Sequence, residues 1–418
     1  MCRQFARRGY TAVAIDYRNG WNPLASGAAG QEIRTGSLLQ AAGRGIQDAK
    51  ACVRFLRNNA LNGGNTWRID ERKIILGGVG TGGYIALGYA TINNYAKISL
   101  PKFTATTTNL AYGFMADSSY FAASFWGDID GYGGQSFLNN STNTPGISNS
   151  VSFVFNMGGA MGDSSWLEAG DVPMVCFHVV NDPFAPYDIG SVIVPTTGDF
   201  VVEAFGSYYV IHKSDSLLNN GSFQFNTWTD PYTTRANAVN NGNDGMFPLE
   251  LPDPPGPAPG QAGPWEWYDS TTVYNICMGL LGFTQGHTDT IWYSSLATNP
   301  DMSRAKGIAY IDTIMGYLNP RLASALVLPT GTPNVPQDVN AITVYPNPSH
   351  DFVRISAEST TGKILKISVV DVSGRLMYEN QNITAKEFIL PCNRFALGMY
   401  FIKVLADRGE VVRKISIQ

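Results

Sequence analysis

The central structural signal of this chain is the stretch Lys73-Ile74-Ile75-Leu76-Gly77-Gly78-Val79-Gly80-Thr81-Gly82-Gly83-Tyr84. An apolar run from 74 to 76 is followed by glycines, and apolar residues then recur at helical spacing from 84 to 90. This order predicts a buried strand, a tight turn and a helix. Because glycines let a strand and a helix approach closely, we expect an α/β unit built around this strand.

The turn also carries a chemical pattern. Its spacing, Gly78-Val79-Gly80-Thr81-Gly82, resembles the Gly-x-Ser-x-Gly nucleophile elbow of α/β-hydrolases, with Gly80 at the nucleophile position. Glycine has no side chain that can attack a carbonyl, so we interpret the position as degenerate. The neighbouring hydroxyl of Thr81 is the alternative nucleophile, but it comes one position late and points away unless the turn is rebuilt.

Neighbouring segments extend the resemblance to the carboxylesterases and lipases of this superfamily. Residues 5–18, which close in Asp16-Tyr17-Arg18, are similar to a helix end and the strand after it. Residues 45–59 place apolar side chains on one helical face, and residues 65–73 are similar to the usual entry into the elbow strand. The resemblance implies a doubly wound, mostly parallel sheet within an α/β-hydrolase-like domain at residues 1–327.

The start of the chain differs from the superfamily pattern. The resemblance implies earlier strands and a His-Gly-Gly type loop that supplies oxyanion N–H groups. We expect roughly the first three strands and half of the oxyanion hole to be missing, because the chain starts at an internal methionine of a longer gene. A full-length parent would also explain why no signal peptide opens the chain. A natural minimal form is the alternative, although it would expose an edge of the parallel sheet.

Two further apolar runs, at 151–156 and 172–179, predict buried strands. The second is similar to the family strand that ends in His-Gly-x-x-Asp-x-x-Val-Pro, and the resemblance implies that Asp182 is the triad acid. A loop-capping aspartate is the alternative, since Asp-Pro is common in turns. His178 matches a residue at the strand end, where we expect a packed, hydrogen-bonded histidine.

A triad histidine should follow the last strand and precede the last helix. The chain has four histidines; His212 falls in a predicted helix and His350 in a different domain. His287 is left by elimination, ahead of a predicted final helix at 303–318. A solvent-exposed loop histidine is the alternative for this residue.

These site residues support two hypotheses of function. The first is a secreted protein that resembles carboxylic-ester hydrolases but is weak or inactive, because oxyanion donors alone contribute about 2.7–4 kcal/mol to transition-state stabilisation. The second is a non-catalytic binding module that is delivered to the surface and keeps the hydrolase cleft.

The composition of the chain narrows the kinds of partner that we expect it to bind. The net charge is −4 and 15% of the 418 residues are charged, which gives no basic field for nucleic acid. The sequence contains no run of eighteen apolar residues, so it predicts no transmembrane segment. Asp128 and Asp130 have calcium-like spacing without the closing glutamate, so we interpret this loop as a turn. We expect neither a metal nor a cofactor. Cys2 and Cys52 lie on two predicted helices and are the pair considered for a single disulfide.

Residues 223–268 are dense in Asn, Gly and Pro and predict an insertion that forms a long loop or lid. It ends in the aromatics Trp265, Trp267 and Tyr268. They could stack on a sugar or an apolar substrate, which makes an ester or glycan the candidate ligand. The alternative is that they pin the loop onto the domain.

The last part of the chain changes character. Residues 328–340 have the composition of a linker, and beyond them short alternating runs predict a β-sandwich at 341–418. The motifs at 344–348, 371–375 and 398–401 resemble the C-terminal sorting domain of type IX secretion cargo. The resemblance implies contact with the type IX secretion machinery, export through the outer membrane and a secreted or cell-surface location.

Overall fold

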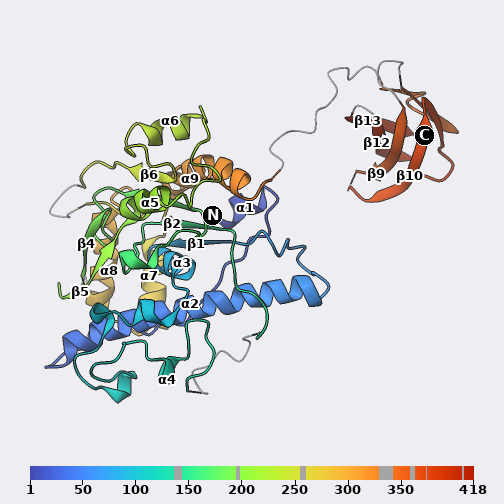
Figure 1. Cartoon of the computed structure of the whole chain (residues 1–418). Helices are drawn as coiled ribbons and strands as arrows, with labels where there is room; N and C mark the ends of the chain where they lie inside the picture. The colour runs from blue at the N-terminus through green and yellow to red at the C-terminus, as the bar shows by residue number, and fades with distance from the viewer. Residues whose placement is uncertain are drawn as a thin grey trace. The chain divides into compact units, whose positions relative to one another are not determined.

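The computed structural model describes residues 1–135, 144–193, 198–254, 260–328, 342–357, 363–372, 374–406 and 409–418. The chain forms two compact units, Met1–Leu328 and Pro329–Gln418 (Figure 1). Apart from Leu328, the linker that the sequence predicts at 328–340 lies outside the described residues.

A four-stranded parallel sheet lies at the centre of the first unit, in the order β1-β2-β3-β6. Its strands are β1 (Ile75–Val79), β2 (Phe153–Met157), β3 (Met174–Val179) and β6 (Met246–Leu249). Every residue of β2, β3 and β6 is buried, as expected for parallel strands covered on both faces. The predicted parallel sheet is therefore present.

Successive residues of these strands enter two different cores, as the side-chain alternation of a strand requires. One core joins Val154, Met174 and Cys176 to helices α2 (Gly30–Asn62), α3 (Thr81–Thr91) and α5 (Ser207–Ser216). The other joins Phe153, Phe155 and Phe177 to helix α9 (Arg304–Ala325). The sheet is thus covered by helices on both faces (Figure 1).

The remaining elements of this unit are shorter. The helices are α1 (Cys2–Ala6), α4 (Ala123–Trp126), α6 (Pro231–Asn237), α7 (Ser270–Tyr274), the π-helix η6 (Asn275–Leu280) and α8 (Gln285–Thr298). The 3-10 turns are η1 (Tyr95–Ile98), η2 (Pro101–Phe103), η3 (Leu110–Tyr112) and η5 (Ser164–Trp166). A separate antiparallel hairpin pairs β4 (Ile189–Ile193) with β5 (Phe200–Phe205).

The structure differs from the sequence interpretation at three places. Residues 10–20 form no strand, because no ladder hydrogen bond reaches them. The predicted loop at 223–268 contains β6, a short buried strand at the end of the sheet, where Pro248 is tolerated because edge strands need fewer N–H donors. Helix α9 continues through Pro320 instead of stopping before it.

The second unit consists of two antiparallel sheets. One has the order β10-β9-β12-β13 and the other β11-β8-β7. The strands are β7 (Ile342–Tyr345), β8 (Phe352–Ala357), β9 (Ile364–Asp371), β10 (Leu376–Ala385), β11 (Glu387–Pro391), β12 (Gly398–Ala406) and β13 (Gly409–Ile417). Alternate residues of β8 and β12 are buried in a shared aliphatic core, so the predicted β-sandwich is confirmed.

Two further features bear on the predictions. In the described part of the chain, no helix is both long and apolar enough to cross a membrane. All five cysteines are free thiols, so the disulfide considered between Cys2 and Cys52 is not formed.

Candidate functional site

The turn between β1 and α3 has the shape of an elbow. Gly80 connects the two elements with φ 55° and ψ −117°, and its N–H donates to the Met157 carbonyl at 2.8 Å. A positive φ of this size is strained for any residue with a Cβ. A Cβ built on Gly80 meets no atom within 4 Å, so the apex faces open space. The turn therefore presents a backbone apex without a reactive atom.

Close packing explains why the strand can turn so sharply. A Cβ on Gly78 would lie 1.8 Å from the Gly82 carbonyl oxygen, so only glycine lets the end of β1 pass the first turn of α3. The glycine spacing seen in the sequence is thus required by the geometry of the elbow.

Thr81, the alternative nucleophile, begins α3 and is exposed. Its hydroxyl oxygen lies 3.1 Å from the Tyr17 hydroxyl. Within the described residues, neither a histidine nor a carboxylate makes a hydrogen bond to this threonine. Among the described residues, the hydrogen-bond partner of Thr81 is thus a tyrosine, and not one of the histidines or carboxylates that most often act as general bases.

Asp182 follows β3 and is almost enclosed, with a side chain that is 4% exposed. One carboxylate oxygen accepts the N–H groups of Phe184 and Ala185 at 2.8 and 3.1 Å, and the other lies 3.8 Å from His178 Nε2. Burial raises the pKa of Asp182 to about 6, although the two backbone hydrogen bonds lower it. The nearby Glu266 carboxylate adds to the rise. Because β1 and β3 are parallel, Gly80 and Asp182 lie at the same edge of the sheet.

His287 lies elsewhere in this unit. It sits in the first turn of α8, where its N–H is capped by the Thr284 hydroxyl and its ring stacks on Phe283 at 4.6 Å. Over the residues that the structure describes, no hydrogen bond or ion pair joins His287 to Asp182. The structure thus brings Gly80 and Asp182 to one edge but gives them no imidazole from this helix.

A buried polar network supports the Asp182 loop. His178 Nε2 lies 3.1 Å from the Ala185 carbonyl, so this nitrogen donates, and Nδ1 accepts the Ser207 hydroxyl at 2.6 Å. Asn156 donates to the same hydroxyl at 2.9 Å. Burial lowers the pKa of His178 to about 4, so the ring is neutral. Ser207, His178 and Asn156 are all fully buried and connect β2, β3 and the start of α5. His178 is therefore the packed, hydrogen-bonded histidine that the sequence predicts.

Two more polar groups lie near Asp182: Tyr84, which the sequence did not single out, and Trp265, which it indicated only as an aromatic that could stack on a ligand. The Tyr84 hydroxyl and the Trp265 indole N–H are buried and make no hydrogen bond. The Trp265 ring and Asp182 Oδ2 flank Gly158, at 3.5 and 3.6 Å from a Cβ built there. Asp182 also raises the pKa of Tyr84, after burial, which is the larger cause. The sequence offered one signal that Tyr84 belongs to the site, because this residue lies one helical turn after Gly80.

The described residues hold no group of three or more His, Cys, Asp or Glu side chains that could bind a metal ion. The Asp128 carboxylate accepts the N–H groups of Asp130 and Tyr132, both at 2.9 Å, and Asp130 pairs with Lys50 at 2.8 Å. This loop is therefore built as a turn that is fixed to α2.

The family match among the comparisons with known proteins lies in the second unit. Residues 343–418 match the family described as secretion system C-terminal sorting domain. No curated protein matches the chain. Among solved structures, a DUF3244 family protein with an immunoglobulin-like β-sandwich fold from Bacteroides vulgatus ATCC 8482 is 16% identical over 21% of this chain and 95% of that chain. Its TM-score of 0.18 is too low to indicate a shared fold. Residues 343–418 are thus a C-terminal sorting domain, and the protein is exported by type IX secretion to the cell surface or beyond.

Proposed function

We propose that the unit Met1–Leu328 is a hydrolase-like binding module that has lost acyl-transfer chemistry and acts outside the cell. The observation that carries this proposal is Gly80, an elbow apex with φ 55° and no side chain. The export domain supports the location, and the elbow supports the kinship to ester hydrolases that the sequence motifs imply.

Three features argue against efficient ester hydrolysis. Gly80 supplies no nucleophile. Among the residues that the structure describes, the Thr81 hydroxyl is hydrogen-bonded to a tyrosine hydroxyl, and no imidazole is hydrogen-bonded to Asp182. In a serine hydrolase, loss of the nucleophile alone costs on the order of 10⁶ in kcat. His178 is not placed to act as a base on an ester, because it is fully buried and both of its ring nitrogens are hydrogen-bonded within the protein.

The groups around Asp182 favour binding of an uncharged, oxygen-bearing ligand. Tyr84 and Trp265 are buried donors without acceptors, and such donors gain when a ligand oxygen pairs with them. Below about pH 6 the Asp182 carboxyl is a further donor. Ester carbonyls and sugar hydroxyls are the two ligand classes that fit, as the aromatic residues near 265–268 also suggest.

Hydrolysis of p-nitrophenyl acetate and butyrate tests the loss of catalysis. We expect wild type and Thr81→Ala to hydrolyse both esters at the same rate, equal to that of a mock purification. Gly80→Ser should remain within about tenfold of that rate, because a serine needs an adjacent base. Turnover in wild type that disappears in Thr81→Ala would overturn the proposal, and strong activity in Gly80→Ser would show that an acid and a base are in place.

Binding is tested with an array of neutral and acidic oligosaccharides and with ethyl esters titrated by calorimetry. We expect a neutral ligand to bind wild type, with affinity reduced about five- to tenfold in Tyr84→Phe and in Trp265→Phe, since each loses one hydrogen bond. Tyr293→Phe, whose side chain lies on the exposed part of α8, is the matched control and should bind as wild type does. Equal binding by all four proteins would place the ligand elsewhere.

A further inference from the structure

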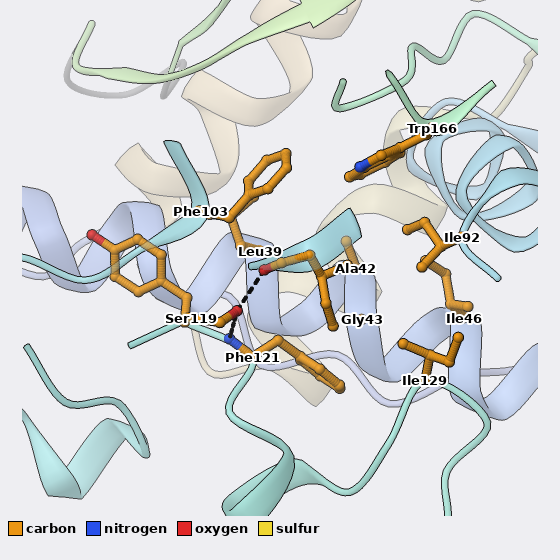
Figure 2. Close-up of a pocket in the computed structure, with 12 residues that line it drawn as sticks. Leu39, Ala42, Gly43, Ile46, Ile92, Phe103, Ser119, Phe121, Ile129 and Trp166 are labelled. Carbon is orange, nitrogen blue, oxygen red and sulfur yellow. Dashed lines mark hydrogen bonds between the residues drawn. The ribbon is translucent and has the colours of Figure 1, made fainter. Parts of the chain in front are cut away.

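A cavity in the first unit has no role in the proposal above. It is a cavity of about 80 Å³ between α2, the end of α3 and the segment 98–129 (Figure 2). The side chains around it are apolar almost throughout and include Leu39, Ala42, Ile46, Ile92, Phe103 and Phe121.

Small residues on α2 create this space. Leu39, Ala42, Gly43 and Ile46 recur at the spacing of one helical face, and the two smallest lie in the middle. A Cβ on Gly43 would lie 2.4 Å from the Phe121 ring, so the ring rests directly on the helix backbone there. Next to it, the short side chain of Ala42 leaves the remaining volume open (Figure 2).

The polar groups in the wall are already used. The Ser119 hydroxyl donates to the Ile98 carbonyl at 2.7 Å and accepts the Phe121 N–H at 3.2 Å (Figure 2). The Trp166 indole N–H donates to the Lys97 carbonyl at 2.6 Å. A buried water needs two to four polar partners, which this wall does not offer. The cavity therefore favours an apolar occupant.

The cavity is separate from the elbow. Gly80 precedes the first residue of α3, whereas Ile92 follows the last. Ile92 comes twelve residues after Gly80, so at a rise of 1.5 Å per residue the two lie about 18 Å apart along the helix. Ligands at the two ends of α3 can thus be studied independently.

We propose that this cavity binds the apolar end of a short alkyl chain. Its volume is about half of the roughly 150 Å³ that accommodates benzene in an engineered apolar cavity. A chain of three or four carbons fits this volume better than an aromatic ring. A charged or hydroxyl-bearing chain end is excluded, since it would lose its hydrogen bonds to water without gaining others.

The test uses 1-butanol as the probe and 1,4-butanediol as its polar match. In the full chain with labelled isoleucine methyl groups, we expect butanol to shift the NMR signals of Ile46, Ile92 and Ile129 in a saturable way. The diol should bind at least about tenfold more weakly, because one hydroxyl would enter the apolar cavity. Ala42→Leu, which fills the space, should reduce butanol affinity by at least about tenfold.

Ala60→Leu is the control, because it adds the same atoms to α2 about 27 Å further along the helix, and it should bind as wild type does. Where tryptophan fluorescence shows that Ala42→Leu is misfolded, the smaller Ala42→Val takes its place with the same expectation. Shifts that grow linearly without saturation, equal affinity for the two probes, or undiminished binding in the filled variant would each overturn the proposal.

Discussion

The two units of this protein are stabilised by different kinds of interior. The first buries charged side chains among its apolar residues, and these include Arg34, Arg44, Lys50, Arg54, Arg57 and Arg321. Among the described residues of the second unit, the buried polar side chains are only Ser349 and Ser368, and the core is aliphatic and aromatic. A sandwich can be specified by alternation alone, whereas the α/β unit also depends on polar contacts between distant segments.

Arg321 illustrates the contacts of the first unit. Its guanidinium, which is fully buried, forms an ion pair with Asp244 and donates to the Tyr317 carbonyl at 2.9 Å. It also lies 4.8 Å from the centre of the Trp228 ring. Asp244 comes just before β6, so this pair fixes α9 to the last strand of the sheet.

The largest effect should come from removing this arginine. Arg321→Met should destabilise the first unit by about 3–5 kcal/mol, because Asp244 is left as an uncompensated, largely buried charge. All eight tryptophans lie in this unit, so tryptophan fluorescence during guanidinium unfolding reports on it alone. Arg72→Met, at a residue whose side chain is 80% exposed, is the control and should change stability by less than about 0.5 kcal/mol. An unchanged midpoint in Arg321→Met would contradict the contrast between the units.

The second prediction concerns the aliphatic core. Ile402 on β12 is fully buried, so Ile402→Ala should cost the second unit about 3 kcal/mol. Hydrogen exchange followed by mass spectrometry should show faster exchange in β9, β12 and β13, while the tryptophan transition stays where it is. Ile389→Ala, on β11 with a 50% exposed side chain, should have little effect. A shift of the tryptophan transition in Ile402→Ala would mean that the units are not independent.

The smallest effect is a pH dependence specific to the first unit. The folded pKa of Asp182, about 6, exceeds its ordinary value of 3.8, so the folded state holds this proton more tightly. The resulting stabilisation is fully present below pH 3.8 and is lost as pH rises through 6, and roughly 2.5 kcal/mol of it is lost between pH 4 and pH 7. The stability of Asp182→Asn relative to wild type should therefore increase from pH 4 to pH 7, measured by tryptophan fluorescence.

His178 supplies the opposite slope in both proteins. Its folded pKa, about 4, lies below the ordinary 6.5, so its contribution is lost as pH falls from 6.5 to 4. Burial and the hydrogen bond to Ala185 set this pKa, with no contribution from Asp182, so the difference between wild type and Asp182→Asn cancels the His178 contribution and isolates the carboxyl. A difference that does not change with pH would show that Asp182 is ionised as readily in the folded chain as in the unfolded one.

The sequence predicted those parts of the fold that depend on local pattern. The elbow strand, its helix, the two following strands and the sandwich all came from apolar runs or alternation, and the structure contains them. Strand pairing between segments that are far apart in the sequence was harder to predict. Residues 10–18 have the pattern of a strand but no ladder partner, and the short run around Pro248 looked like part of a loop although it pairs with β3.

The candidate site shows the same limit. Gly80 and Asp182 could be placed at one edge, because parallel strands end on the same side of a sheet. His287 was chosen by elimination and chain order, which carry no information about distance. Ser207 and Asn156 are single polar residues in apolar surroundings, so nothing in the sequence revealed that they meet His178.

Residues 414–418 are hydrogen-bonded to the first turn of the sandwich domain. The Ser349 N–H donates to the Ser416 carbonyl, and the Gln418 N–H donates back to the Ser349 carbonyl, both at 2.9 Å. Asn347 likewise donates to the Lys414 carbonyl at 2.8 Å. The first turn of the domain and residues 414–418 therefore lie side by side and form one continuous surface. A receptor that binds the folded domain at this point would contact residues 347–349 and 414–418 together, so removing either segment would remove part of the surface that it contacts.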